Sequence, residues 1–145
     1  MNLNLVDTPF FLNIYGLGAM ALNGDHVGTI FRLSEKVWQS VKANDLKNKG
    51  RNVWVYEQNE KVFAGIELNE RPEPGTNLEQ KDIWLAKYAY YKHVGSYKLL
   101  KEVGIEMRRH LAARGIKTCL PFLEIYGHWS ADESNLETEL YMCLQ

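Results

Sequence analysis

One pattern of hydrophobic spacing occurs in both halves of the chain. Each half has a strand-like segment, then apolar residues at helical spacing, then two more strand-like segments. In the first half these segments are 10–15, 29–43, 52–57 and 62–68, and in the second half they are 83–94, 97–113, 119–127 and 137–144. Two such β-α-β-β units predict an α+β fold: an antiparallel sheet with both helices on one side. We expect a ligand pocket on the other side of the sheet, or at the seam between the halves.

The two units form pseudo-repeats of about 9–68 and 82–144, joined by a linker at 69–81. The linker contains two prolines and a glycine among mostly polar residues, which is typical of a loop. A length of 145 residues fits one domain, 1–145. The residues that we expect each helix to bury are Ile30, Leu33, Val37 and Val41 in the first, and Leu99, Leu100, Val103, Met107 and Leu111 in the second.

Charge and hydropathy restrict the classes of partner. The formal net charge is −1, so no overall positive field attracts nucleic acid or an anionic membrane. No apolar run approaches the roughly 20 residues of a membrane span, and the N-terminus lacks a basic region followed by an apolar one. We therefore expect a cytoplasmic protein with no membrane contact and no direct nucleic-acid binding.

The two cysteines are expected to be reduced. Cys119 and Cys143 fall on strands that are predicted to pair as a hairpin. If Glu124 faces the Tyr141 side of that hairpin, the two cysteine side chains project to opposite faces of the sheet and cannot easily form a bridge. This register predicts two structural thiols, as is usual in a reducing compartment.

Glu124 is the strongest candidate for a functional residue. It lies in the strand-like segment Phe122–Tyr126, where alternation places Phe122, Glu124 and Tyr126 on one face. Both faces are mostly apolar, so the strand is expected to be covered on both sides. A carboxylate there costs several kcal/mol of desolvation unless it is paired or its pKa rises. It is therefore either satisfied by neighbouring side chains or kept for a ligand, as a counter-charge to a cation or as a general base.

Other aromatic residues are candidates for the walls of the pocket. Tyr141 is expected to share the face of Glu124 across the hairpin. Ala89, Val53 and Val55 suit packing under a helix because they are small or β-branched. Their neighbours along the strands, Tyr88, Tyr90, Trp54 and Tyr56, would then face a ligand on the other side of the sheet. The predicted ligand-binding residues are Glu124, Tyr126, Tyr141, Tyr88, Tyr90, Trp54, Tyr56, Phe122 and Trp129. Plain packing is the competing interpretation for each aromatic residue.

No cofactor or metal is predicted. No histidine has metal-ligand spacing to another His or Cys, and His93 is expected to make a structural hydrogen bond at the end of its strand. The segment Tyr15–Ala21 reads G-x-G-x-x-A after a strand, which resembles a dinucleotide-binding loop. We reject that interpretation because Asn23 and Gly24 interrupt the helix it requires.

Three motifs of the second half resemble the GyrI-like small-molecule-binding family. The motifs are KYAYYKHVGSY at 87–97, PFLEIY at 121–126 and TELY at 138–141. This family includes the effector-binding domains of multidrug-sensing and AraC-type transcription activators. The chain departs from the family pattern at Ser96, where proline is commoner. The resemblance implies a duplicated β-α-β-β fold and an aromatic pocket around a glutamate, which corresponds to Glu124 here.

The resemblance also implies candidate functions. The first is a stand-alone protein that captures lipophilic, cationic or electrophilic small molecules around Glu124. The second is a hydrolase of strained electrophilic molecules, in which Glu124 acts with Tyr126 or Tyr141. The third is a protein inhibitor of a partner such as DNA gyrase, although no residue of this chain indicates a protein partner.

Overall fold

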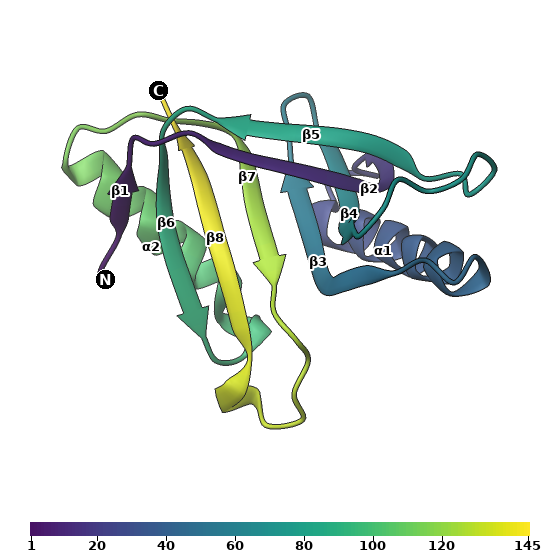
Figure 1. Cartoon of the computed structure of the whole chain (residues 1–145). Helices are drawn as coiled ribbons and strands as arrows, with labels where there is room; N and C mark the ends of the chain where they lie inside the picture. The colour runs from purple at the N-terminus through teal and green to yellow at the C-terminus, as the bar shows by residue number, and fades with distance from the viewer.

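The computed structural model describes all residues from 1 to 145, and its strands form one antiparallel sheet (Figure 1). The strand order across the sheet is β1-β6-β8-β7-β3-β4-β2-β5. The strands are β1 (Asn4–Val6), β2 (Phe10–Met20), β3 (Asn48–Tyr56), β4 (Lys61–Leu68), β5 (Glu79–Leu85), β6 (Tyr88–Val94), β7 (Thr118–Tyr126) and β8 (Glu137–Leu144). The helices are α1 (His26–Ala43) and α2 (Leu100–Ala113), with short 3-10 turns η1 (Tyr97–Leu99) and η2 (Glu133–Asn135).

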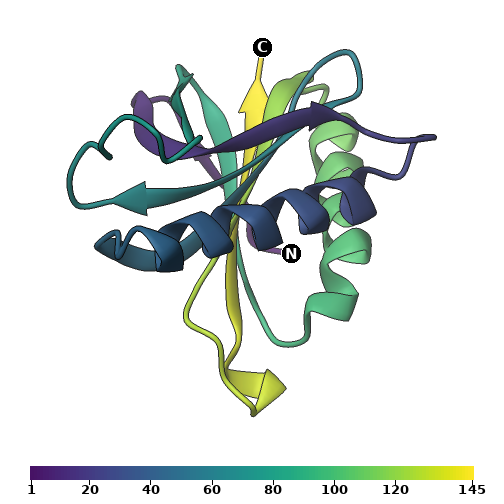
Figure 2. The same cartoon turned by 90° about the vertical axis from the view of Figure 1, so that its right-hand side faces the viewer.

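The predicted α+β architecture with both helices on one side of the sheet is confirmed (Figure 2). Helix α1 covers β2 and β4, and its buried Ile30 packs against Val62 and Ala64. Helix α2 covers the other half, where Met107 and Leu111 pack in one cluster with apolar residues of β6, β7 and β8. Neither helix has the length and apolar character that crossing a bilayer requires.

Side-chain caps mark where helix α1 and the turn η1 begin. The Asp25 carboxylate accepts a hydrogen bond from the Gly28 amide at 2.9 Å, so α1 starts earlier than the predicted residue 29. The Ser96 hydroxyl accepts from the Lys98 amide at 3.2 Å and opens η1 before α2. Leu99 lies in that tighter turn and is 52% exposed, so the prediction that it is buried is wrong.

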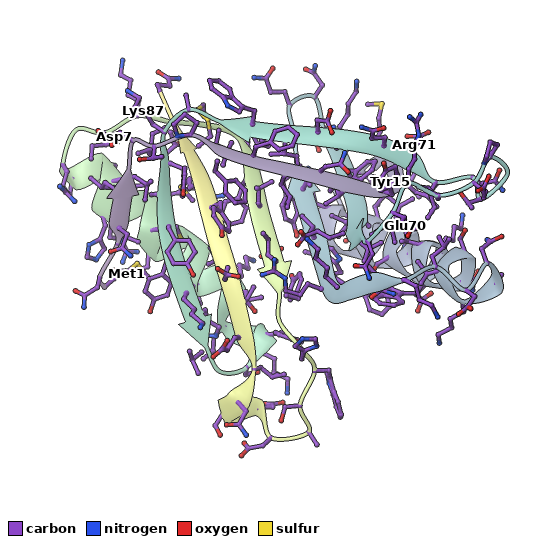
Figure 3. The ribbon with its side chains drawn as sticks, in the orientation of Figure 1. Met1, Asp7, Tyr15, Glu70, Arg71 and Lys87 are labelled. Carbon is purple, nitrogen blue, oxygen red and sulfur yellow. A yellow bond between two sulfur atoms is a disulfide. The ribbon has the colours of Figure 1, made fainter.

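The segment predicted as one strand at 83–94 is two strands that serve different halves of the sheet. Strand β5 pairs with β2, whereas β6 pairs with β1 and β8. The chain passes from one half of the sheet to the other at residues 86–87, between β5 and β6. It makes a similar crossing between β1 and β2. Figure 3 labels Asp7 and Lys87 at these two crossings. Residues 79–81, predicted as the end of the linker, belong to β5.

The glycine-rich segment after residue 15 continues strand β2 and forms no phosphate-binding loop. Gly16 pairs with Gly65 of β4, and a Cβ at Gly16 would lie 1.9 Å from the carbonyl oxygen of Ala64. Glycine is required here because the two strand backbones approach closely. The rejection of a dinucleotide site therefore has a structural reason.

The sheet face away from the helices is filled, because the bent sheet folds β2 and β5 across it (Figure 1). Leu12 and Ile14 of β2 and Ile83 and Leu85 of β5 pack there in one apolar cluster with residues of β3 and β7. Val53 and Val55 belong to this cluster and do not lie under a helix. This cluster occupies part of the face on which we expected a ligand pocket, the first of the two expected positions.

The predicted register of the β7–β8 hairpin is wrong by one residue. Glu124 lies opposite Leu140, and Leu123 lies opposite Tyr141, so Glu124 and Tyr141 project to opposite faces. The alignment is set at the loop end of the hairpin, where Tyr126 pairs with Thr138, and it continues to Phe122 opposite Met142. Between Thr118 and Phe122, β7 has a bulge that adds two residues relative to β8, so each side chain keeps its face.

The observed register also changes the relation between the two cysteines. With Leu123 opposite Tyr141, Cys119 and Cys143 lie on the same face; their Cα atoms are 4.9 Å apart and a disulfide joins them. The prediction of two reduced thiols is wrong for this reason. The cysteines therefore do not support an assignment to a reducing compartment.

Candidate functional site

A cleft of about 1480 Å³ lies between α1 and α2, on the helix side of the sheet. Its floor is the pair of strands β3 and β7, where the two halves of the fold meet. This is the second of the two expected positions, the seam. The floor residues are Asn52, Trp54 and Tyr56 of β3 and Phe122, Glu124 and Tyr126 of β7. Strand pairing places Trp54 directly beside Glu124, because these two residues are opposite each other in the register.

Glu124 lies at the centre of this floor and is 7% exposed. Tyr56 donates a hydrogen bond to Glu124 Oε1 at 2.7 Å, and Tyr126 donates to the same oxygen at 3.0 Å. No protein group donates to Oε2, although the residue lines the cleft. One carboxylate oxygen is therefore held in place by the protein, and the other has no protein donor.

The electrostatics of this group favour fixed protonation states for the two tyrosines. Burial raises the pKa of Glu124, and the two tyrosine hydrogen bonds oppose that rise without cancelling it. Burial and the nearby Glu124 charge raise the pKa of both Tyr56 and Tyr126. Both hydroxyls thus stay protonated at neutral pH and act as donors. Such a carboxylate can balance a buried cation, or take a proton from a bound molecule.

Aromatic rings surround the carboxylate. The rings of Trp54 and Tyr126 meet edge to face at 5.0 Å, and those of Tyr97 and Tyr126 at 5.3 Å. Tyr56 and Phe122 are 5.9 Å apart. Edge-to-face packing leaves ring faces available, and these faces attract cations. The indole NH of Trp54 is buried and has no hydrogen-bond acceptor within the protein.

Exposed apolar side chains lie along the rim of the cleft, among polar and charged ones. Helix α1 contributes Val27 and Phe31, α2 contributes Ile105, and β7 contributes Leu120, all of them exposed. Trp129, from the loop after β7, is 76% exposed and also lines the cleft. A guest that is larger than the floor can therefore extend onto apolar surface.

The structure brings six of the nine predicted ligand-binding residues to this cleft. They are Glu124, Tyr126, Trp54, Tyr56, Phe122 and Trp129. Trp54 and Tyr56 arrive there on the helix side of the sheet, the opposite of the side that we expected for them.

Tyr88, Tyr90 and Tyr141 do not line the cleft. They lie on the opposite face, near a different carboxylate. Tyr90 donates a hydrogen bond to Glu139 at 2.7 Å, and Tyr141 donates one to Glu139 at 3.4 Å. Ala89 does pack under α2, as predicted, and this turns Tyr88 and Tyr90 away from the helices. Because the cleft is on the helix side, the same alternation removes them from the site.

Sequence reasoning missed several residues that line the cleft. Phe31 and Trp38 of α1 are seven residues apart and therefore share one helix face, a spacing that could have identified them. Tyr97 belongs to the motif at 87–97, in which Tyr88 and Tyr90 were predicted to bind the ligand in its place. His93 bonds to the Ser96 carbonyl oxygen at 3.0 Å, the structural role expected of it. No group of three His, Cys, Asp or Glu side chains is placed to hold a metal ion.

No protein-family model and no curated protein sequence matches this chain, whereas several solved structures do. SAV2435 bound to tetraphenylphosphonium matches with a TM-score of 0.67 at 20% identity, over 100% of this chain and 94% of that chain. The EcmrR C-terminal domain matches with a TM-score of 0.70 at 16% identity, over 99% and 96%. In the EcmrR–DNA complex, this chain covers 57% of the EcmrR chain.

A hydrolase from Listeria innocua also matches, with a TM-score of 0.56 at 11% identity, over 99% of this chain and 91% of that chain. All of these identities are low, so the matches concern the fold. Together with the sheet order and the two helices, they show that the chain has the GyrI-like effector-binding fold that its sequence motifs resemble.

Proposed function

We propose that this chain is a small-molecule-binding protein that captures lipophilic organic cations in the cleft between α1 and α2. The observation that carries the proposal is Glu124: a buried carboxylate at an aromatic floor, with one oxygen held by two tyrosines and the other unpaired.

A lipophilic cation gains from this site in two ways. Its charge pairs with Glu124 where water is largely excluded, so the attraction is stronger than at the surface. Its apolar groups meet the faces of Trp54, Tyr126 and Tyr97, which adds cation–π and hydrophobic contact. An empty site leaves a desolvated carboxylate without a counter-charge, and a cation removes that cost.

The size of the cleft suits a bulky guest. Its volume of about 1480 Å³ exceeds the roughly 300–1,000 Å³ of common ligand pockets. The bound tetraphenylphosphonium of SAV2435, a protein of the same fold, is a compound of this class. It is the probe that we choose for this chain.

Tryptophan fluorescence tests the proposal, because Trp54, Trp38 and Trp129 all line the cleft. Titration with tetraphenylphosphonium should give a saturable change, and Glu124→Gln should weaken the affinity by at least about tenfold, or ~1.4 kcal/mol. The matched control is Glu139→Gln, which removes the other tyrosine-bonded carboxylate from the opposite face of the sheet. Equal loss in both variants, or in neither, would contradict the proposal.

A hydrolase is the second candidate, and a specific observation favours it. Burial raises the pKa of Glu124, which suits a general base, and a hydrolase from Listeria innocua shares the fold. Tyr141 cannot take part because it lies on the other face, so Tyr56 or Tyr126 would be the proton donor.

Mass spectrometry separates the two candidates. If the chain is a hydrolase, incubation with a panel of strained electrophiles such as epoxides should yield a product that gains one water. That product should be absent with Glu124→Gln and present with Glu139→Gln. Compounds that are bound and recovered unchanged would leave binding as the function for that panel.

A further inference from the structure

The charges of the cleft are distributed unequally between its walls. The wall formed by η1 and α2 contributes three cations, Lys98 of η1 and Lys101 and Arg108 of α2, and no acidic residue. None of the three makes an ion pair within the protein, although Arg109, next to Arg108, is bonded to Glu106 at 2.6 Å. Helix α1 contributes one charge of each sign, Glu35 and Lys42.

The remaining acidic residues of the cleft already have partners. Glu57 is paired with Lys81, and Glu60 lies 3.1 Å from His26. Apart from Glu124, the charge that is left to meet a guest from the floor and from α2 is therefore positive. A purely cationic guest would be attracted by the floor and repelled by the α2 wall.

Arg108 already occupies the cation–π position at one end of the floor. Its guanidinium carbon is 5.7 Å from the centre of the Phe122 ring. A second cation at this ring would meet the positive charge of Arg108. The cationic part of a guest is therefore directed to the other end, between Glu124, Trp54 and Tyr126.

We propose that the natural ligand of this cleft is bipolar: an aromatic molecule with a cationic centre and an acidic group, the acidic group lying against Arg108. This inference rests on the proposed function and deepens it. Phe122 and Glu124 are two residues apart on one face of β7, which separates them by about 7 Å along the strand. The cationic centre and the acidic group should thus be about 7–10 Å apart. A carboxylate, sulfonate or phosphate would meet the guanidinium through charge-assisted hydrogen bonds.

A matched pair of dyes tests this directly. A rhodamine methyl ester and the corresponding free acid share the same cationic ring system and differ by one carboxylate. Fluorescence anisotropy gives the dissociation constant of each, and the ratio of the two constants measures recognition of the acidic group. The wild-type protein should bind the free acid more tightly than the ester.

Arg108→Gln should lower this preference by about fivefold, the upper end of what a partly exposed ion pair contributes. Arg108→Glu should lower it further, because the wall charge is then reversed. Arg109→Gln is the control: the same change at the adjacent residue, whose guanidinium is held by Glu106, should leave the ratio unchanged. Added salt should reduce the preference in the wild-type protein.

The outcomes separate this inference from the proposed function. If the ester binds but the ratio is the same in wild type and Arg108→Gln, the bipolar ligand is refuted and cation binding stands. If neither dye binds, both proposals are refuted for aromatic cations. If the affinity for the free acid depends on Arg108 and not on Glu124, recognition of the acidic group by Arg108 is supported, and the proposed role of Glu124 in binding the cation is refuted.

Discussion

Glu124→Gln should make the unliganded protein more stable at neutral pH, although it removes the proposed binding group. Glutamine has nearly the shape of a protonated glutamate, and its amide oxygen can accept the hydrogen bonds of Tyr56 and Tyr126. The change removes a charge that is desolvated in the folded chain and fully hydrated in the unfolded one. A site that is built for a ligand thus lowers the stability of the empty protein.

The sign and size of this change in the free energy of unfolding follow from proton linkage. Because the pKa of Glu124 is raised in the folded protein, its protonated form stabilises the fold at low pH. That contribution is fully present below the unfolded pKa and is lost as pH rises through the folded value. Each unit of difference between the two pKa values corresponds to about 1.4 kcal/mol. A gain on the order of 1 kcal/mol in Glu124→Gln would raise the Tm by roughly 3 °C for a chain of this length.

Urea denaturation of wild type and Glu124→Gln, at pH 4 and at pH 8, measures this effect. We expect the two proteins to have similar free energies of unfolding at pH 4 and the variant to be the more stable at pH 8. Glu139→Gln is the contrasting change, since it breaks the 3.0 Å ion pair between Glu139 and Arg51 and should destabilise at pH 8. A variant Glu124→Gln that is less stable at pH 8, or that differs equally at both pH values, would refute the reasoning.

Three further predictions concern the hydrogen bonding of Glu124, the disulfide and the packing under α2. Tyr56→Phe should further raise the pKa of Glu124 and weaken tetraphenylphosphonium binding at neutral pH by about 1–2 kcal/mol, because it removes a hydrogen bond to the carboxylate. Tyr141→Phe, on the other face of the sheet, should change neither, and calorimetric titration of both variants makes the comparison. Cys119→Ser should cost about 3 kcal/mol of stability by opening the loop closed with Cys143, and the unfolded wild-type chain should show no free thiol to a colorimetric reagent until it is reduced. Met107→Ala should cost about 2–5 kcal/mol in urea denaturation, because this fully buried side chain leaves a cavity under α2.

The sequence predicted the architecture because each element has a local signal. Helical spacing of Ile30, Val37 and Val41, and of Met107 and Leu111, sets which face each helix buries. Strand alternation placed Glu124 and Tyr126 on one face correctly. These properties depend on neighbours within a few residues, and periodicity reports them directly.

Features that depend on distant segments were not predictable in the same way. The alignment of β7 with β8 is set where the loop between them closes, at Tyr126 opposite Thr138, and periodicity within either strand does not fix it. The observed register differs by one residue from the predicted one, which places Tyr141 on the face opposite Glu124 and Cys119 beside Cys143. Alternation gives the two faces of a strand, but it does not tell which face meets the cleft.

The bend of the sheet also depends on distant segments, and it too changes where the site lies. Nothing local to β2 or β5 shows that they fold across the back of β3 and β7 and fill the face where we expected the pocket. Residues of α1 and α2 became cleft walls for the same reason, since the space left for a guest lies between the helices.

Proton release on ligand binding tests the central claim most directly. If a cation pairs with Glu124, binding favours the ionised carboxylate, so a proton should leave when tetraphenylphosphonium binds below the folded pKa of this group. Isothermal titration calorimetry in two buffers of different ionisation enthalpy counts that proton. We predict proton release by the wild-type protein that disappears as pH rises, and none by Glu124→Gln. Tight binding without proton release at any pH, or identical release by the variant, would contradict the account.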